Sequence, residues 1–445
     1  MRLFLKKPGF SSLAPLRRVI QSLPVGLLIL AFATVSCTTG CKKEKKAGKK
    51  PKTQPISQTT PTPTPSPTPA PTPQPPPGAV YFLSNPDGLN SVEAFSRNST
   101  TGFVTYLGSF PSGGNGSAAI QGSQSHAVLA NGSFLYAVNS GNGSFSTFRL
   151  DADGRPTLFA TTSSNGTRPV SIAIHGNLLF VLNQGIPAGD GGSVDGGLVG
   201  FSIGADGIPA AIPGAITPFD SEDMPSDVFF TGNGLRLAVM RSGAKSVSTF
   251  AVDPSGALSD QRTINVGSQP VGGAATSRLP WSGFAAIVSV VEDYGPASVV
   301  SFQAESALTI VSQVGADVDT DPCWATTSVN GQRLWTSNFQ PKTLTLYRVG
   351  SDSSLVREGL YEPAPGVGPG SLDLDVSADG RFLYRLRAFN SNGSPTPPHP
   401  FPIVEVFQIN PSNANGGLSL IQSVEVSIVA LQYASPTGMA VADLQ

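Results

Sequence analysis

The stretch FLYAVNSGNGSFSTFRLDADGRPTLFATTSSNGTRPVSIAIHGNLLFVLN (residues 134–183) contains four short apolar runs separated by turn signals. The runs FLYAV, SFSTFRL and LFATT have the length and composition of β-strands, and a fourth run, SIAI, follows Pro169. Asn-Gly and Asp-Gly pairs lie between the runs, where a hairpin turn needs positive φ angles. LLFVLN then repeats FLYAVN. The stretch therefore predicts one four-stranded unit followed by the start of the next.

The clearest mark of this repeat is the strand that follows FLYAV, because in every copy it ends on an aromatic residue. A four-stranded unit of this length is typical of a propeller blade. One such sheet cannot bury both of its faces, so we expect the aromatic residue to pack between adjacent blades. An open array of β-sandwiches is the alternative. The seven copies end at Phe95, Phe148, Phe201, Phe250, Phe302, Tyr347 and Phe407.

The register of the repeat predicts how the fold closes. VYFLSN (residues 80–85) matches the second strand of a unit, whereas PTGMAVADL (residues 436–444) matches the first strand. We therefore expect the C-terminal strand to complete the first blade by pairing beside its N-terminal strand, with Met439 close to Tyr81. The predicted fold is an all-β, seven-bladed propeller of four-stranded antiparallel blades over residues 78–445.

Residues 1–36 have the pattern of an export signal, with a basic start and a short apolar run. Cys37, in TVSC, resembles the lipidated cysteine of bacterial lipoproteins, and Cys41 is the alternative. Residues 37–77 are rich in Lys and then in Pro and Thr, which predicts an unfolded linker. We expect an exported bacterial lipoprotein, bound to the membrane by its anchor and facing the periplasm or the cell surface. Plain cleavage or an uncleaved anchor are the other interpretations.

The charge of the chain is divided unevenly. Residues 1–52 hold 12 of the 28 basic residues but one of the 29 acidic residues, which leaves 16 basic against 28 acidic residues beyond them. An acidic folded body lacks the basic surface that nucleic acid requires, so we expect no nucleic-acid partner.

Loops that enter the innermost strand of a blade lie on the same face as those that follow its second strand. The long inserts at residues 185–197, 292–297 and 390–402 fall on this face, which predicts a binding surface for a small molecule, a glycan or a protein. His126, in QSHAV, stands at the head of one inner strand. The other candidate binding residues on this face are Asp223, Arg241, Asp293 and His399.

One acidic loop has the spacing of metal ligands. Asp317, Asp319 and Asp321 alternate as in a calcium-binding loop, although the glycine and the distal glutamate of an EF-hand are missing. Calcium is therefore the one cofactor that the sequence suggests, and a solvated acidic loop without a bound ion is the alternative interpretation.

The repeat resembles the lactonase family of seven-bladed propellers, which includes 6-phosphogluconolactonases and a carboxymuconate-cyclising enzyme, and it is also similar to YVTN surface-layer propellers. SHAVLANGSFLYAVNSGNGSFSTFRLDADGRPTL and SLDLDVSADGRFLY carry the resemblance. Family members often read PCHLAV where this chain reads QSHAV, so the resemblance implies a catalytic His126. The next blade usually carries PHAH, but Pro169–Ile172 reads PVSI here and both imidazoles are missing.

Two functions follow from these observations. The first is an extracytoplasmic binding module, favoured by the linker, the inserts and the missing imidazoles. The alternative is a lactone hydrolase in which His126 acts as general base. The hydrolase requires a second titratable group within hydrogen-bonding distance of His126 in the central cleft.

Overall fold

The computed structural model describes residues 77–117, 125–190, 192–275, 284–290, 297–315, 321–339, 341–362, 369–388, 401–410, 412, 416–427 and 436–444. The predicted export signal, Cys37, Cys41 and the linker lie outside these ranges. Within the described residues, no helix is long and apolar enough to cross a membrane.

The described strands form seven four-stranded sheets, and every pairing within them is antiparallel. From the innermost strand outward, the first sheet is β28 (Thr437–Asp443), β1 (Gly78–Leu83), β2 (Gly88–Arg97) and β3 (Val104–Gly116). The next three are β4 (Val128–Asn131), β5 (Phe134–Asn139), β6 (Ser144–Leu150) and β7 (Pro156–Ser163); β8 (Pro169–His175), β9 (Leu178–Asn183), β10 (Gly196–Ile203) and β11 (Pro209–Phe219); and β12 (Pro225–Phe230), β13 (Arg236–Arg241), β14 (Ser246–Val252) and β15 (Leu258–Asn265). The last three are β16 (Gln269–Ala275), β17 (Phe284–Val290), β18 (Ser298–Gln303) and β19 (Thr309–Gly315); β20 (Pro322–Thr327), β21 (Arg333–Asn338), β22 (Leu344–Val349) and β23 (Leu355–Tyr361); and β24 (Gly370–Val376), β25 (Phe382–Ala388), β26 (Ile403–Ile409) and β27 (Leu418–Glu425).

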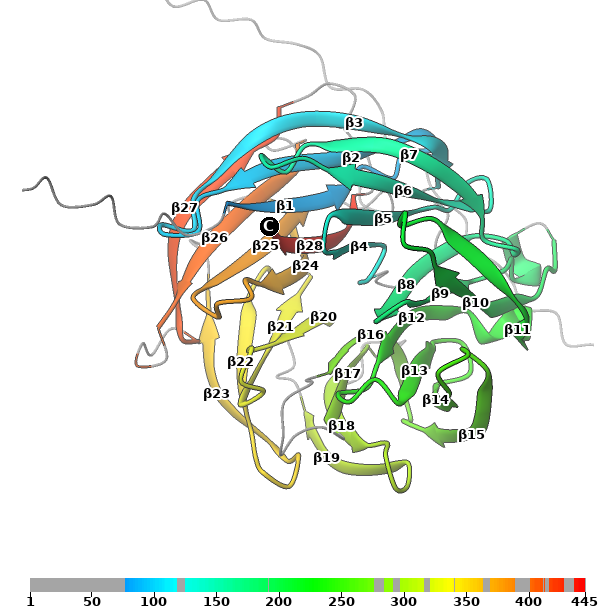
Figure 1. The fold of residues 1–445 in the computed structure, drawn as a ribbon. Helices are drawn as coiled ribbons and strands as arrows, with labels where there is room; N and C mark the ends of the chain where they lie inside the picture. Colours follow the sequence, from blue (N-terminus) through cyan, green and yellow to red (C-terminus); the bar gives the residue numbers. More distant parts are fainter. Residues whose placement is uncertain are drawn as a thin grey trace, which may run out of the picture. The chain divides into compact units, whose positions relative to one another are not determined.

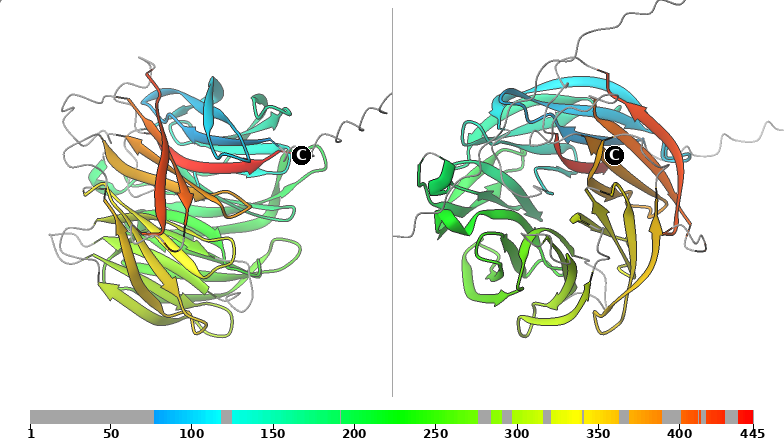
Figure 2. Two further views of the ribbon diagram at one scale, coloured as in Figure 1. Left: turned by 90° about the vertical axis from the view of Figure 1, so that its left-hand side faces the viewer. Right: turned by 180° about the vertical axis from the view of Figure 1, so that it is seen from behind.

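The prediction of an all-β fold with four-stranded antiparallel blades is confirmed. The inner strands β4, β8, β12, β16, β20, β24 and β28 contact one another in this order, and β28 contacts β4 again. The sheets therefore follow one another around a common axis, with their first strands innermost (Figures 1 and 2). The described helical turns are the short 3₁₀ segments η1 (Ala188–Asp190) and η2 (Ser221–Asp223).

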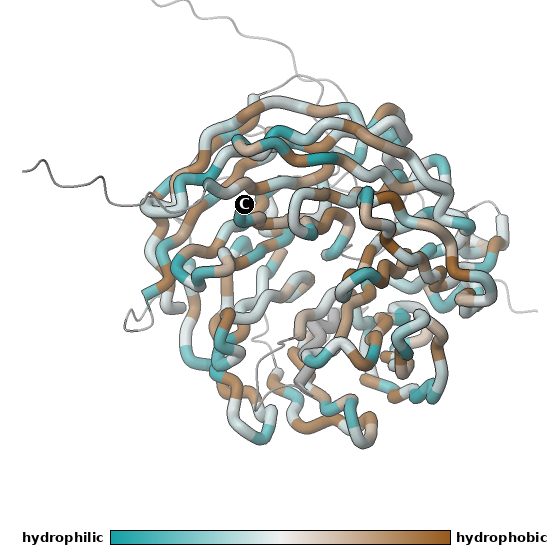
Figure 3. Tube along the Cα trace, in the orientation of Figure 1, coloured by the Kyte–Doolittle hydropathy of each residue, from teal (hydrophilic) through white to brown (hydrophobic). Residues whose placement is uncertain are grey.

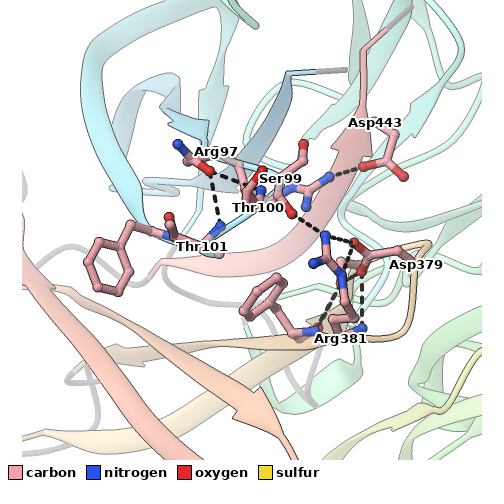
Figure 4. A network of polar contacts seen from close by, with 12 residues as sticks. Arg97, Ser99, Thr100, Thr101, Asp379, Arg381 and Asp443 are labelled. Carbon is pink, nitrogen blue, oxygen red and sulfur yellow. Dashed lines mark hydrogen bonds and ion pairs between the residues drawn. The ribbon is translucent and has the colours of Figure 1, made fainter. Parts of the chain in front are cut away.

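The C-terminal strand lies in the first sheet, as its place in the repeat predicts. β28 pairs with β1, and Ala440 stands opposite Tyr81. Next to this pairing, Arg97 at the end of β2 forms an ion pair with Asp443 of β28 (Figure 4). In the same network Arg381 contacts Asp379 and the carbonyl oxygen of Ser99. The two ends of the described chain are thus joined through backbone pairing and charged side chains.

The aromatic residues that mark the repeat are all buried. Hydrophobic residues are frequent along the strands of the sheets (Figure 3), and buried apolar side chains of neighbouring sheets belong to common core clusters. Phe82 and Phe95 of the first sheet, for example, share a core cluster with Leu383 and Phe407 of the β24–β27 sheet. Each buried aromatic side chain stabilises the fold by about 1.5–3 kcal/mol through transfer out of water. In all seven sheets the pairing of the third and fourth strands shifts register beside this aromatic residue, which indicates a repeated β-bulge.

A second repeated contact links neighbouring sheets. The hydroxyl group of Tyr136 on β5 donates to the Gly207 carbonyl oxygen in the next sheet, at 2.8 Å. Tyr384 on β25 makes the same bond to Gly102 of the first sheet at 2.9 Å, across 282 residues of sequence. Equivalent bonds are made by Tyr81 to Gly154 and by Trp335 to Gly416. Each of these hydrogen bonds provides a donor for a carbonyl oxygen at a turn, which would otherwise lie between two sheets without a partner.

The β24–β27 sheet also contains a buried ion network. Glu405 on β26 accepts from Arg385 Nε and from Arg387 Nη1, both at 2.8 Å. All three residues are at most 4% exposed, so each charge depends on the other two for compensation.

Candidate functional site

His126 lies just before β4 and is paired with a carboxylate from another sheet. Its Nδ1 atom is 2.8 Å from Oδ1 of Asp227 on β12. The His126 side chain is 26% exposed and that of Asp227 is fully buried. This bond uses Nδ1, and the hydrogen bonds of the described residues include none to the second ring nitrogen. The hydrolase hypothesis requires a titratable group within hydrogen-bonding distance of His126, and Asp227 is such a group.

Asp227 holds three inner strands together at this point. Its Oδ1 atom accepts from Ser171 Oγ at 2.8 Å and from the Val228 amide at 3.0 Å, and its Oδ2 atom accepts from the Gly273 amide at 3.1 Å. Ser171 lies on β8 and Gly273 on β16, so the carboxylate joins both neighbours of β12. A register shift next to Pro225 places Asp227 in this position. Because the Ser171 hydroxyl bonds to the carboxylate and not to the imidazole, these residues do not form a nucleophilic triad.

His126 lines a cavity of about 250 Å³ among the inner strands. Small residues such as Ala274 and Ala325 form one wall, which explains why the space is not filled by side chains. The volume is just below the roughly 300–1,000 Å³ that is usual for ligand pockets, so it suits a small ligand. The lining also includes Ser125, Leu129, Ala275, Thr326, Thr327, Val329, Asp373, Leu374, Asp375, Val376 and Met439.

Two further carboxyl groups of this cavity come from β24. Asp373 is 2% exposed and accepts from its neighbour's amide at Leu374 and from the Met439 amide of β28, at 2.9 and 2.8 Å. Asp375 accepts from the amides of Val376 and Val441 at 2.7 and 2.9 Å. Burial raises the pKa of Asp373 well above its usual range and raises the pKa of Asp375 to about 6. The Asp375 carboxyl group can therefore exchange a proton near neutral pH.

The electrostatics of the cavity fix the charge of His126. Burial lowers the pKa of His126, but the Asp227 carboxylate, together with Asp373 and Asp375, outweighs this effect and raises the pKa to about 9. The ring is therefore an imidazolium at neutral pH and donates from both nitrogens. An imidazolium donates hydrogen bonds, so these surroundings favour donation to a ligand oxygen over the general-base role that the sequence predicts for His126.

The remaining candidates from the sequence lie elsewhere or cannot be placed. Asp223 and Arg241 form an ion pair with each other at 2.5 Å, on the face where the inner strands begin. Asp293, His399, Asp317 and Asp319 lie outside the described residues, and Asp321 is at the start of β20. Among the residues that the structure describes, no group of three His, Cys, Asp or Glu side chains is arranged to hold a metal ion.

The cavity includes residues from both ends of the inner strands, since Ser125 and His126 precede β4. Its lining includes the last two residues of three inner strands: Ala274–Ala275 of β16, Thr326–Thr327 of β20 and Asp375–Val376 of β24. Sequence reasoning missed Asp227, Asp373 and Asp375. The sequence does contain a signal for these three residues. Most inner strands have apolar or small residues at the corresponding positions, whereas PSDV and SLDLDV have carboxylates.

One segment of the sequence, from β2 to the residues just after β9, matches a family model. Residues 89–186 match the family model described as lactonase, seven-bladed β-propeller. Over this segment, which is less than half of the chain, the sequence is similar to the lactonase propellers. No curated protein sequence matches it.

Solved structures with the same fold have diverse functions. A Bacteroides fragilis protein assigned provisionally as a 6-phosphogluconolactonase is 18% identical, with a TM-score of 0.60 over 84% of this chain and 100% of that one. The Pseudomonas aeruginosa periplasmic gluconolactonase is 16% identical, with a TM-score of 0.56 over 82% and 100%. A hypothetical selenium-binding protein from Sulfolobus tokodaii is 11% identical, with a TM-score of 0.58 over 82% and 94%. At these identities the likeness concerns the fold alone.

Proposed function

We propose that this lactonase-like propeller is an exported, lipid-anchored lactone hydrolase, with its seven sheets closed into one ring by β28. The observation that carries the proposal is the His126–Asp227 pair in the wall of a cavity that Asp375 also lines. Cys37 holds the lipid, and residues 37–77 keep the propeller away from the membrane. The reaction adds water to the lactone carbonyl and yields the open-chain hydroxy acid.

The two titratable groups take complementary roles. The imidazolium of His126, held by Asp227, donates its free N–H to the carbonyl oxygen of the lactone and stabilises the oxyanion that forms. Asp375, whose pKa is raised to about 6, accepts a proton from the attacking water as its oxygen bonds to the carbonyl carbon. The ring C–O bond then breaks, and the leaving ring oxygen takes up the proton from Asp375. The enzyme is thereby returned to its starting state.

The substrate is a lactone without a phosphate group. Among the described residues that line the cavity there is no Lys or Arg, and a phosphate group is usually bound by such side chains. Asp375, whose pKa is about 6, is ionised at neutral pH and would repel a phosphate group. The periplasmic gluconolactonase that shares the fold agrees with an unphosphorylated lactone and with a site outside the cytoplasm.

The test is hydrolysis of D-glucono-1,5-lactone by the full-length protein, followed as proton release and corrected for spontaneous opening. Asp375→Asn removes the base and is expected to lower kcat/KM by about 10²-fold or more. The matched control is Asp379→Asn, since Asp379 lies four residues further along, outside the cavity lining; it is expected to stay within about twofold of wild type. A wild-type protein no faster than buffer, or an Asp375→Asn variant with full activity, would refute the proposal.

A binding module without catalysis is the second candidate. The observation that favours it is Pro169–Ile172, where the two imidazoles of the PHAH motif are replaced by PVSI. In this case lactones or sugars bind in the cavity and are released unchanged. Ligand-induced stabilisation without turnover in the same experiment would select this function.

A further inference from the structure

We propose that Phe229 is a positioning residue, whose ring holds the imidazole of His126 against Asp227 in the wall of the cavity. The inference rests on the proposed function, because it takes His126 as the hydrogen-bond donor to the lactone. Among the described residues, His126 lines the cavity and Phe229 does not. An effect of Phe229 on the reaction must therefore act through His126.

The hydrogen bond to Asp227 fixes only one atom of the His126 side chain. His126 Nδ1 is 2.8 Å from Asp227 Oδ1, and the His126 carbonyl oxygen accepts from the Ile172 amide of β8 at 2.9 Å. With these contacts alone the imidazole could still pivot about the line that joins Nδ1 to Oδ1. A donor to a developing oxyanion needs a defined direction, since a misplacement of about 1 Å can cost about 10²-fold in rate.

The ring of Phe229 provides a second contact to the same imidazole. The centroids of the two rings are 6.0 Å apart, and their planes are inclined by 43°. Asp227 and Phe229 are two residues apart on β12 and pair with β13 without a register shift between them, so their side chains lie on the same face of the strand. One strand therefore supplies both a hydrogen bond and a ring contact to His126, which together restrict its rotation.

Phe229 is itself held in place by close packing. It is 5% exposed and belongs to a core cluster with Met240 of its own sheet and with Val300 and Phe302 of the next sheet. A side chain in a close-packed core has little room to move away. Phe229 therefore provides the fixed support that a functional side chain needs from its neighbours.

The next residue of β12 offers a matched control. The rings of Phe230 and His175 have centroids 5.4 Å apart and planes inclined by 44°, which is close to the geometry at His126. His175 is exposed and is not among the described residues that line the cavity. Phe230→Leu therefore removes a similar ring contact from a histidine outside the site.

The effect on the reaction is tested by hydrolysis of D-glucono-1,5-lactone with the full-length protein. Phe229→Leu is expected to lower kcat at least about tenfold and to leave KM within about twofold, because the oxyanion is present in the transition state and not in the bound substrate. Phe230→Leu is expected to keep both constants within about twofold of wild type. Thermal unfolding shows whether both variants are folded.

NMR spectroscopy of the full-length protein with labelled histidines tests the geometry without turnover. In the wild type we expect a nuclear Overhauser effect between the ring protons of His126 and Phe229, and this measurement remains decisive if Phe229→Leu does not fold. Phe229→Leu should shift the ring signals of His126 and leave those of His175 in place. Phe230→Leu should give the reverse pattern.

The inference and the proposed function can fail separately. A missing Overhauser effect, or an unchanged kcat for Phe229→Leu in a protein that opens the lactone, would overturn the inference and leave the hydrolase intact. An equal loss of kcat in both variants would also contradict it, because a general loss of structure would then explain the result. If the wild type opens no lactone, the proposed function is rejected, and the NMR spectra alone decide whether Phe229 holds the His126 ring.

Discussion

Replacing Asp227 with Asn should convert His126 from a cation to a neutral residue at physiological pH. The Asp227 carboxylate, 2.8 Å from Nδ1, is the main reason that the pKa of His126 is raised to about 9. Without that negative charge, burial is left as the dominant effect and lowers the pKa to about 6.5 or below. A decrease of about 2.5 pKa units corresponds to roughly 3 kcal/mol, at 1.36 kcal/mol for each unit. The Asp227 carboxylate is thus the main group that keeps the His126 ring protonated.

NMR titration can measure this change directly, because the chain contains three histidines and each gives its own ring signal. His126 should titrate near pH 9 in the wild type and at least about two units lower in Asp227→Asn. Ser171→Ala is the matched control, since it removes another hydrogen bond to the same carboxylate oxygen without removing charge. If wild-type His126 titrates below pH 7, or if Asp227→Asn leaves its pKa unchanged, the electrostatic argument is wrong.

The same shift has a consequence for stability. The folded-state pKa of His126 is above the unfolded value of about 6.5, so the folded state binds the additional proton more tightly. The resulting stabilisation is fully present below about pH 6.5 and is lost as the pH rises through about 9. In urea unfolding, the free energy of unfolding of the wild type should therefore decrease as the pH rises across this range. The Asp227→Asn variant should lack the part of this decrease that His126 contributes.

Three further predictions concern the fold and the reaction. Tyr384→Phe removes the buried bond to the glycine carbonyl of the first sheet and should cost about 1–3 kcal/mol in urea unfolding; a cost below about 0.5 kcal/mol would contradict this role. Glu405→Gln leaves two buried guanidinium groups uncompensated and should cost about 3–5 kcal/mol, whereas Glu358→Gln at an exposed ion pair should cost at most about 1 kcal/mol; equal Tm values for the two variants would be inconsistent with this reasoning. Lactone hydrolysis should show a bell-shaped pH profile that rises as Asp375 ionises near pH 6 and falls as His126 loses its proton near pH 9; a rate that increases steadily through pH 10 would exclude His126 as donor.

The fold could be read from the sequence because each strand carries its own local signal. The aromatic residue at Phe148 and the Asp-Gly pair that follows it recur with little change in neighbouring units, and local pattern is sufficient to predict β-strands. The pairing of β28 with β1 followed from register alone, since the chain begins one strand into a unit and ends with the missing strand. No long-range contact had to be known in advance.

The site could not be read in this way, because it depends on which side chains meet at the axis. His126 and Asp227 are 101 residues apart and belong to sheets that are separated by the β8–β11 sheet. They meet because inner strands converge and because a register shift beside Pro225 changes the direction of the next side chains. An irregularity of one residue is not visible in a hydrophobic pattern, although it determines whether a carboxylate points to the axis or to a neighbouring sheet.

The position of the cavity also could not be predicted from the lengths of the loops. Long inserts indicate where the chain can vary, whereas an axial cavity forms where the inner side chains are too small to fill the centre. Gly272, Gly273, Ala274 and Ala275 follow one another along β16, and Ala325 stands on the neighbouring inner strand. The small volume of these side chains, and not the length of any loop, leaves the space that the cavity occupies.

The carboxylates of the inner strands have a structural role. Asp227 accepts an amide of β16, and Asp373 and Asp375 accept amides of β28, so each one links its strand to the next inner strand, where backbone pairing is absent. Asp373 and Asp375 each accept two N–H groups on separate oxygen atoms, and an asparagine could accept only one of them because its other terminal atom is a donor. The cost of burying the carboxylate is expressed in the raised pKa values of Asp373 and Asp375. Asp227 gains compensation from His126. The His126 imidazolium also lowers the pKa of Asp373 and Asp375, but burial outweighs this effect and leaves both values raised, so these two carboxyl groups can carry a proton that an asparagine cannot.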